Sequence, residues 1–163
     1  MSYTVTLRPV KPWSLRQGLL GSVLLAGLCA CTNAQPLHAD MASAVASQAF
    51  HALRSTAGHF AGGVWNEDVD RWNGKKHRAM EALLEQVRQG DYQSSQLIGL
   101  MGQPDRIWPE SSGQYSQMLQ QTQWQGVAQG ELWAYHWRGE HDQLLFALQQ
   151  GRVTASGWLL SGE

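Results

Sequence analysis

The chain has 163 residues, of which 43% are hydrophobic and 15% charged, as expected for a single globular domain with short extensions. Three of its twelve Lys and Arg residues lie within residues 1–30, so the remainder carries nine basic against thirteen acidic side chains. A mildly acidic chain lacks the excess of positive charge with which proteins bind the phosphate backbone, so we expect no nucleic-acid partner.

The N-terminus has the layout of a bacterial export signal. Three positive charges precede an apolar run over residues 18–28, which is too short to span a bilayer as a helix. The run ends in Leu-Cys-Ala-Cys at residues 28–31, and this tetrapeptide resembles the lipobox of bacterial lipoproteins. The resemblance implies that residues 1–30 are a signal peptide and that Cys31 becomes the lipidated N-terminus. The alternative is an ordinary secretory signal that leaves Cys31 as a free thiol.

The residues after the lipobox bear on location and attachment. In lipoproteins an Asp directly after the modified Cys favours retention in the inner membrane, so Thr32 implies the periplasmic face of the outer membrane. Acyl chains on Cys31 would make the membrane a stable partner, since two or more chains anchor a protein. Residues 31–40 are polar, contain a proline and lack periodicity, which predicts a flexible tether. The two cysteines lie in this export region, so no disulfide framework is expected.

Residues 41–163 are expected to form a single α+β domain that begins with helices. Residues 41–57 are rich in Ala and Ser and predict a helix, and we expect residues 41–63 to attach only loosely. The next helix is clearer, because four apolar residues recur at positions i, i+3, i+4 and i+7: Met80, Leu83, Leu84 and Val87. Gly90 is predicted to end it.

The start of this second helix has two possible positions. A start at Gly74 would put four basic residues at the positive end of the helix dipole, which is unfavourable. A start near Asp70 supplies an N-cap and is the one we expect. A third, short helix is predicted over Leu97–Met101, with Ser94 or Ser95 as its cap and Gly102 as its end.

The last third of the chain changes to the period of β-strands. Residues 132–137, 144–148 and 153–160 are joined by short, Gly-containing connections, which predicts a three-stranded antiparallel meander. Residues 106–108 are a possible short strand, and residues 118–124 a possible helical turn. Helices followed by strands predict an α+β fold in which the N-terminal helices pack on one face of the meander, and we expect the other face to be exposed and to contribute to a partner surface. An aromatic stripe is expected at that contact: Trp133, Tyr135, Trp137 and Phe146.

The order of these features resembles the SmpA/OmlA (BamE-like) group of outer-membrane lipoproteins. The resemblance rests on a short helix that ends in Gly102-Gln103-Pro104 and on the strand pattern Trp133-Ala134-Tyr135. It implies an α+β fold at the outer membrane and a role in the assembly of outer-membrane proteins. The present chain departs from that pattern by an insertion over residues 106–130.

Two clusters of polar side chains are candidates for a site. The basic segment after residue 74 is flanked by tryptophans, and we expect a partner-binding surface there that consists of Trp65, Trp72, Lys75, Lys76 and Arg78. The alternative is a solvated helix face. The second cluster is His136, Glu140, His141 and Asp142, which could bind a metal or form an acid–base pair. We interpret it as a polar hairpin tip and expect no metal or cofactor.

No nucleophile, phosphate-loop, zinc-protease or dinucleotide motif is present, so we expect a protein that is not an enzyme. The leading hypothesis is a non-catalytic envelope lipoprotein that binds an envelope protein partner, as an assembly factor or scaffold. The first alternative is a periplasmic inhibitor or immunity lipoprotein. The second is a small cell-wall hydrolase, which would need a cleft with paired carboxylates.

Overall fold

Helices precede strands along the chain, and the protein belongs to the α+β class, as the sequence predicts. The computed structural model describes residues 35–161, with side chains from residue 41 onward. The signal peptide, Cys31 and Thr32 therefore lie outside the described residues. The elements are α1 (Gln35–Leu53), the 3-10 helix η1 (His59–Ala61), α2 (Lys75–Gln89), α3 (Ser94–Met101), β1 (Arg106–Trp108), α4 (Tyr115–Gln121), β2 (Gln123–Gly126), β3 (Glu131–Arg138), β4 (Asp142–Gln149) and β5 (Arg152–Leu160).

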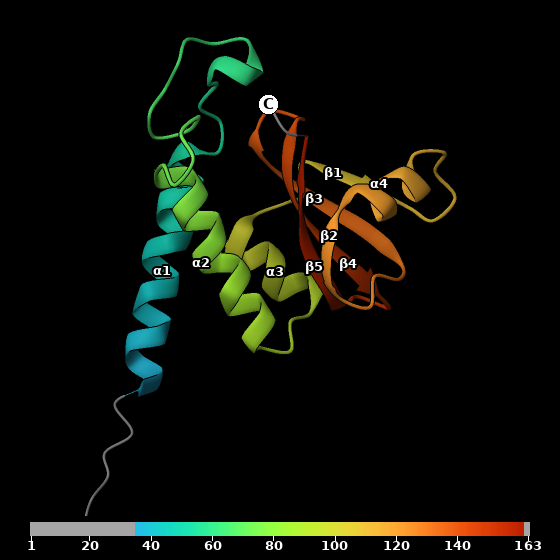
Figure 1. The fold of residues 1–163 in the computed structure, drawn as a ribbon. Coiled ribbons are helices and arrows are strands. Elements are labelled where there is room, and N and C mark those ends of the chain that lie inside the picture. Colours follow the sequence, from blue (N-terminus) through green and yellow to red (C-terminus); the bar gives the residue numbers. More distant parts are fainter. Residues whose placement is uncertain (1–34, 162–163) are drawn as a thin grey trace, which may run out of the picture. The chain divides into compact units, whose positions relative to one another are not determined.

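The strands form one antiparallel sheet with the order β1-β3-β4-β5-β2 (Figure 1). The three strands predicted from alternation are the central three, joined by hairpins. The expectation of only three strands is wrong, because β1 pairs with β3 and β2 pairs with β5 at the two edges. The connection between β4 and β5 has positive φ at Gln150 (52°) and Gly151 (77°), a type I′ geometry that matches the twist of the strands.

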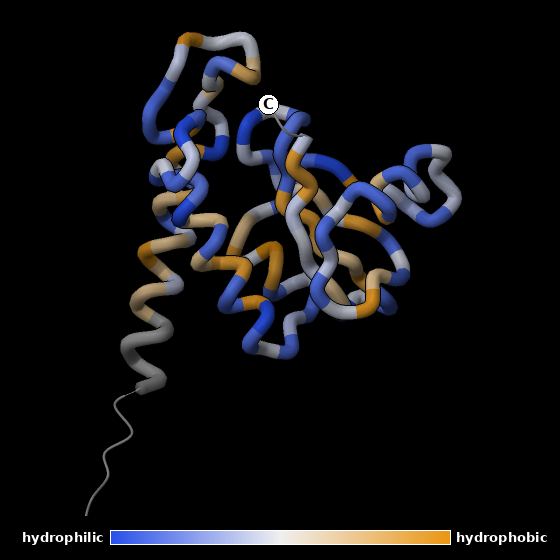
Figure 2. Tube along the Cα trace, in the orientation of Figure 1, coloured by the Kyte–Doolittle hydropathy of each residue, from blue (hydrophilic) through white to orange (hydrophobic). Residues whose placement is uncertain are grey.

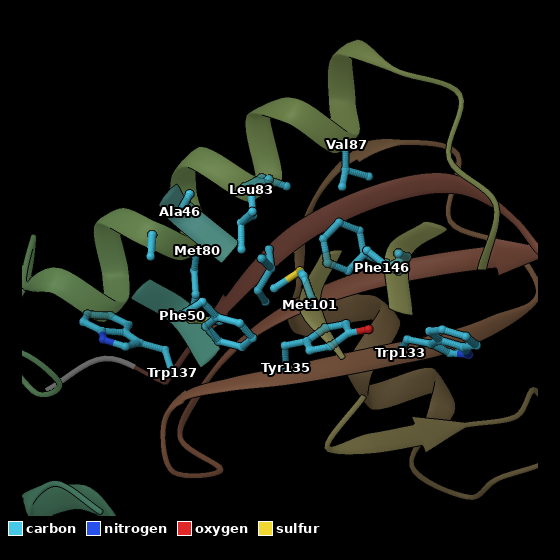
Figure 3. Close-up of a cluster of buried hydrophobic side chains, with 14 of the residues drawn as sticks. Ala46, Phe50, Met80, Leu83, Val87, Met101, Trp133, Tyr135, Trp137 and Phe146 are labelled. Atoms are coloured by element: carbon cyan, nitrogen blue, oxygen red, sulfur yellow. The ribbon is translucent and has the colours of Figure 1, made fainter. Parts of the chain in front are cut away.

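One face of the sheet carries the main core, and α1, α2 and α3 cover it (Figures 1 and 3). Every second residue of β3 points to this face, so Trp133, Tyr135 and Trp137 are buried there together with Phe146 of β4. The aromatic stripe is therefore a core feature, as expected. The predicted stripe of α2 contributes its partners Met80, Leu83, Leu84 and Val87.

The opposite face of the sheet is also covered, by the segment between β1 and β2. Trp108, Tyr115, Met118, Leu119 and Trp124 pack on a second set of strand residues: Leu132, Ala134, Leu145, Ala147, Ala155 and Leu159. The expectation that the sheet exposes one face to a partner is thus wrong. The insertion over residues 106–130 supplies both edge strands and α4, and it closes this face.

Helix α1 is longer and more firmly attached than the sequence suggests. It continues back to Gln35, so the backbone of residues 35–40, expected to belong to the tether, is helical. Phe50 is completely buried in the main core, and Ser47 Oγ donates a hydrogen bond of 2.6 Å to the Leu100 carbonyl of α3. We expected residues 41–63 to attach only loosely, but the side of α1 that carries Ser47 and Phe50 is firmly packed on the rest of the domain. Along residues 35–161, no helix has the length and apolar character needed to cross a membrane.

Helix α2 begins at Lys75 with Gly74 as its N-cap, so the start expected near Asp70 is wrong. Asp70 is fully buried and instead accepts hydrogen bonds from the backbone N–H groups of His59 (2.9 Å) and Asn66 (2.7 Å). The basic first turn is stabilised by Asp68, which pairs with Lys75 at 2.8 Å. The cap of α3 also differs from the expectation, because Gln93 and Gln96 form it and not Ser94 or Ser95.

Candidate functional site

An open groove between α1 and α2 is lined mostly by apolar side chains. Its volume is about 470 Å³, and its walls are Met41, Ala42, Val45, Ala46, Ala49, Lys75, Arg78, Ala79 and Ala82. Five of these nine residues are alanine, so the two helices leave an open trough where larger side chains would close it. Arg78 and Lys75, of which Lys75 pairs with Asp68, lie at one end of the groove.

The α1 side of this groove presents large apolar side chains to solvent. Met41 and Val45 on α1 are 68% and 64% exposed. Figure 2 shows hydrophobic residues interspersed with more polar ones along the described part of α1. The described part of the chain has seven large hydrophobic residues that are exposed, and five of them lie on α1 or in the 64–72 segment. Apolar side chains gathered around a groove are typical of a protein-interaction surface.

A second hollow adjoins the groove at the start of α2. It measures about 390 Å³ and is lined by Glu67, Asp68, Arg71, Trp72, Asn73, Gly74, Lys75 and Arg78. Lys75 and Arg78 line both hollows, so the two are neighbours along the helix. Asp68 pairs with Lys75 at 2.8 Å and Glu67 with Arg71 at 3.5 Å, which makes the wall a mixed-charge surface around the half-exposed Trp72.

The structure brings together three of the five residues expected to bind a partner. Trp72, Lys75 and Arg78 line one hollow, and Trp72 is 54% exposed. Trp65 is also half-exposed, but it lies outside this hollow and donates its indole N–H to Glu67 at 2.8 Å. Lys76 is only 3% exposed and faces a different pocket, so its assignment to the partner surface is wrong. Sequence reasoning missed Met41 and Val45, because an Ala-rich helix gives little indication of which face it buries.

Trp72 also covers a buried histidine. The His77 ring lies 4.3 Å from the Trp72 ring, 4.4 Å from Trp137 and 5.4 Å from Trp158, measured between ring centroids. Neither of its ring nitrogens has a hydrogen-bond partner. Burial in this aromatic cage, assisted by the positive charge of Arg138, lowers the pKa of His77. His77 is therefore held neutral at the base of the candidate surface.

We expect this histidine to make the protein less stable in acid. Because the folded state disfavours the protonated ring, the stabilisation is complete above the ordinary histidine pKa of about 6.5 and is lost as the pH falls through the lowered pKa. The slope from one such group is at most about 1.4 kcal/mol per pH unit. Urea unfolding of the wild type and of His77→Phe between pH 7 and pH 5 measures the effect, and the variant should show the shallower dependence.

The polar residues around the β3–β4 turn do not converge on one point. Asp142 is buried and pairs with Arg138 at 2.7 Å, whereas Glu140 points to Arg106 at 3.0 Å. The Asp142 carboxylate also accepts the N–H of Ser161 at 3.1 Å, which holds the end of β5 against the turn. Within residues 35–161, no group of three or more His, Cys, Asp or Glu residues could hold a metal ion.

Comparison with protein-family models, with curated proteins and with solved structures found no significant match to this chain. The functional argument therefore rests on the residues of the chain itself.

Proposed function

We propose that the protein is a non-catalytic lipoprotein of the cell envelope that binds a protein partner through the groove between α1 and α2. The observation that carries the proposal is the apolar groove itself, with Met41 and Val45 exposed on its rim. Both faces of the sheet are already covered within the chain, so the apolar side chains around the groove are not needed to complete the core. Trp72 lines the hollow that shares Lys75 and Arg78 with the groove, and the half-exposed Trp65 and Trp72 are proposed as further contacts.

The shape of the groove favours a helical partner segment. Alanines on both walls allow another backbone to approach closely, and the apolar rim would contact residues spaced three or four apart on the incoming helix. Lys75 and Arg78 at one end favour acidic residues on the matching end of the partner. A smaller hollow of about 220 Å³ shares Ala42 and Ala82 with the groove and is also lined by Glu85, Gln86 and Gln89. The end of the groove far from Lys75 is therefore bordered by one acidic and two neutral polar side chains.

The location proposed for this binding is the periplasmic face of the outer membrane. The proposed location rests on three features of the N-terminal sequence: the export signal, the lipobox cysteine Cys31 and Thr32. It also rests on the resemblance to the SmpA/OmlA group, which has the same order of helices, Gly-x-Pro turn and aromatic strand. Helix α1 begins four residues after the proposed lipid-bearing cysteine. An anchor only ten residues before Met41, the first residue of the groove, would keep the binding surface near the membrane, where a scaffold or assembly factor meets its partner.

A matched pair of substitutions on α1 tests the groove. Ala42 and Ala44 are both exposed helix residues, but only Ala42 lines the groove. Ala42→Arg should place a long charged side chain in the groove and reduce recovery of the partner by about tenfold or more, whereas Ala44→Arg should not. The measurement is co-purification from detergent-solubilised envelopes, with the bound proteins quantified by mass spectrometry.

Both variants should fold as the wild type does, since arginine is a good helix former and neither position is buried. Equal recovery of every bound protein with the two variants would contradict the groove as the binding site. Recovery of one soluble periplasmic enzyme instead of a membrane protein would favour the inhibitor class.

A further inference from the structure

His77 lies behind the half-exposed Trp72 and has no hydrogen-bond partner among the described residues. The residue is 2% exposed, and both ring nitrogens are buried without a partner. Glu81 Oε1, one helical turn further along α2, is 3.9 Å from Nε2, which is too far for a hydrogen bond. Protonation would add a positive charge and a second N–H donor in a place without an acceptor. The charged form of His77 therefore requires access to water, which the surrounding rings prevent.

Besides Glu81 of α2, charged groups on two strands face the imidazole, and their effects oppose one another. Arg138 of β3 disfavours the protonated ring, whereas Asp142 of β4 favours it, and these two side chains pair with each other at 2.7 Å. The groups that contact the ring from the segment before α2 and from β5 are the indoles of Trp72 and Trp158. Indole faces attract a cation but offer no acceptor for its N–H groups. Exclusion of water is therefore the main cause that keeps the imidazole neutral and its pKa low.

The three indoles around His77 differ in how firmly they are held. Trp72 is 54% exposed, whereas Trp137 and Trp158 are 0% and 9% exposed. The indole N–H of Trp137 donates a 2.7 Å hydrogen bond to a backbone carbonyl, and Trp158 is part of β5. Trp72 belongs to neither a helix nor a strand but to the turn of residues 71–74, which a backbone hydrogen bond of 2.8 Å closes. Displacement of the Trp72 ring would therefore admit water to His77 while the sheet and α2 stay intact.

We propose that Trp72 is a pH-sensitive cover, whose ring leaves the aromatic cage when His77 is protonated and water reaches the imidazolium. With the ring displaced, His77 ionises as an ordinary histidine does, whereas with the ring in place its pKa is lowered. Each pH unit below about 6.5 therefore favours the displaced ring by up to about tenfold, until the lowered pKa is reached.

The cover would regulate the proposed partner surface, because Trp72 lines the hollow that it shares with Lys75 and Arg78. This consequence rests on the proposed function, and a partner that contacts the Trp72 ring would bind more weakly in acid. The displacement of the ring is a property of the chain alone. It can therefore be measured without a partner, and the two proposals can fail separately.

Fluorine nuclear magnetic resonance of the full-length protein in detergent, labelled with 5-fluorotryptophan, tests the displacement. Trp72→Phe and Trp65→Phe identify the signals of these two residues. Between pH 7 and pH 5 the Trp72 signal should move toward its position in the unfolded protein. Its shift between H₂O and D₂O, which reports contact with solvent, should roughly double, because the residue is 54% exposed at the start. The signal of Trp65, which is half-exposed but outside the cage, should not move.

His77→Phe keeps an aromatic ring in the cage that cannot be protonated, so the Trp72 signal should remain at its neutral position down to pH 5. If this variant fails to fold, nitrogen-15 resonances of His77 in the wild type give its titration midpoint, which should coincide with that of Trp72. A His77 ring that stays neutral at pH 5, or a Trp72 signal that does not move while His77 titrates, would overturn the proposal. So would the same movement of Trp72 in His77→Phe, or movement of the Trp137 and Trp158 signals together with it.

Discussion

Replacing Trp137 with alanine should lower the free energy of unfolding by about 3–5 kcal/mol. The indole is fully buried in the main core, and its N–H donates a 2.7 Å hydrogen bond to the Val69 carbonyl. The ring also lies against His77 and Trp158, so its removal leaves a cavity in the aromatic cage and an unpaired carbonyl above it. Equilibrium unfolding in urea, followed by circular dichroism, measures the loss.

Trp65→Ala is the matched control for this prediction, because Trp65 is half-exposed and belongs to neither of the two core clusters. It should change the free energy of unfolding by no more than about 0.5 kcal/mol. A comparable loss of stability in both variants would mean that Trp65 belongs to the core. Its proposed place on the partner surface would then be wrong.

Replacing Cys31 with serine should abolish acylation and release the protein from membranes altogether. Stable anchoring requires two or more acyl chains, and serine offers no thiol for the thioether-linked lipid. The measurement is incorporation of labelled palmitate together with separation of soluble and membrane fractions. Cys29→Ser is the control and should remain acylated and membrane-bound. Acylation that persists in Cys31→Ser but is lost in Cys29→Ser would show that the other cysteine carries the lipid.

Local patterns were sufficient to predict most of the elements. Aromatic residues at every second position of residues 132–137 predict β3, because Trp133, Tyr135 and Trp137 lie on the one face of the strand that the helices cover. The short helix before Gly102 and the strand at residues 106–108 were also predicted correctly. In each case the signal lies within a few residues of the element itself.

The incorrect predictions concern contacts between residues distant in sequence. Asp70 looks like a helix cap in the sequence, but its Oδ2 atom accepts the backbone N–H groups of His59 and Asn66 instead. Lys76 looks like a surface residue of a basic run, but the segment after α1 folds over it and buries it. Neither contact has a signature in the neighbouring sequence.

The candidate surface was predicted only in part, for a related reason. The tryptophans and the basic run identified the hollow around Trp72, Lys75 and Arg78. The larger groove depends on how α1 packs against α2, and alanines on both helices carry almost no periodic signal. The second face of the sheet was wrongly expected to be open, because residues 106–130 have too little periodicity to predict that α4 and β2 cover it.

Site-specific photo-crosslinking in intact cells tests partner binding through the groove most directly. A benzophenone amino acid at Ala82, an exposed position inside the groove, is compared with the same amino acid at Gln120, an exposed position on α4 across the sheet. We expect ultraviolet light to produce a discrete adduct with one envelope protein from position 82 and none from position 120. Absence of an adduct from position 82, or the same adducts from both positions, would contradict the assignment of the groove as the binding site.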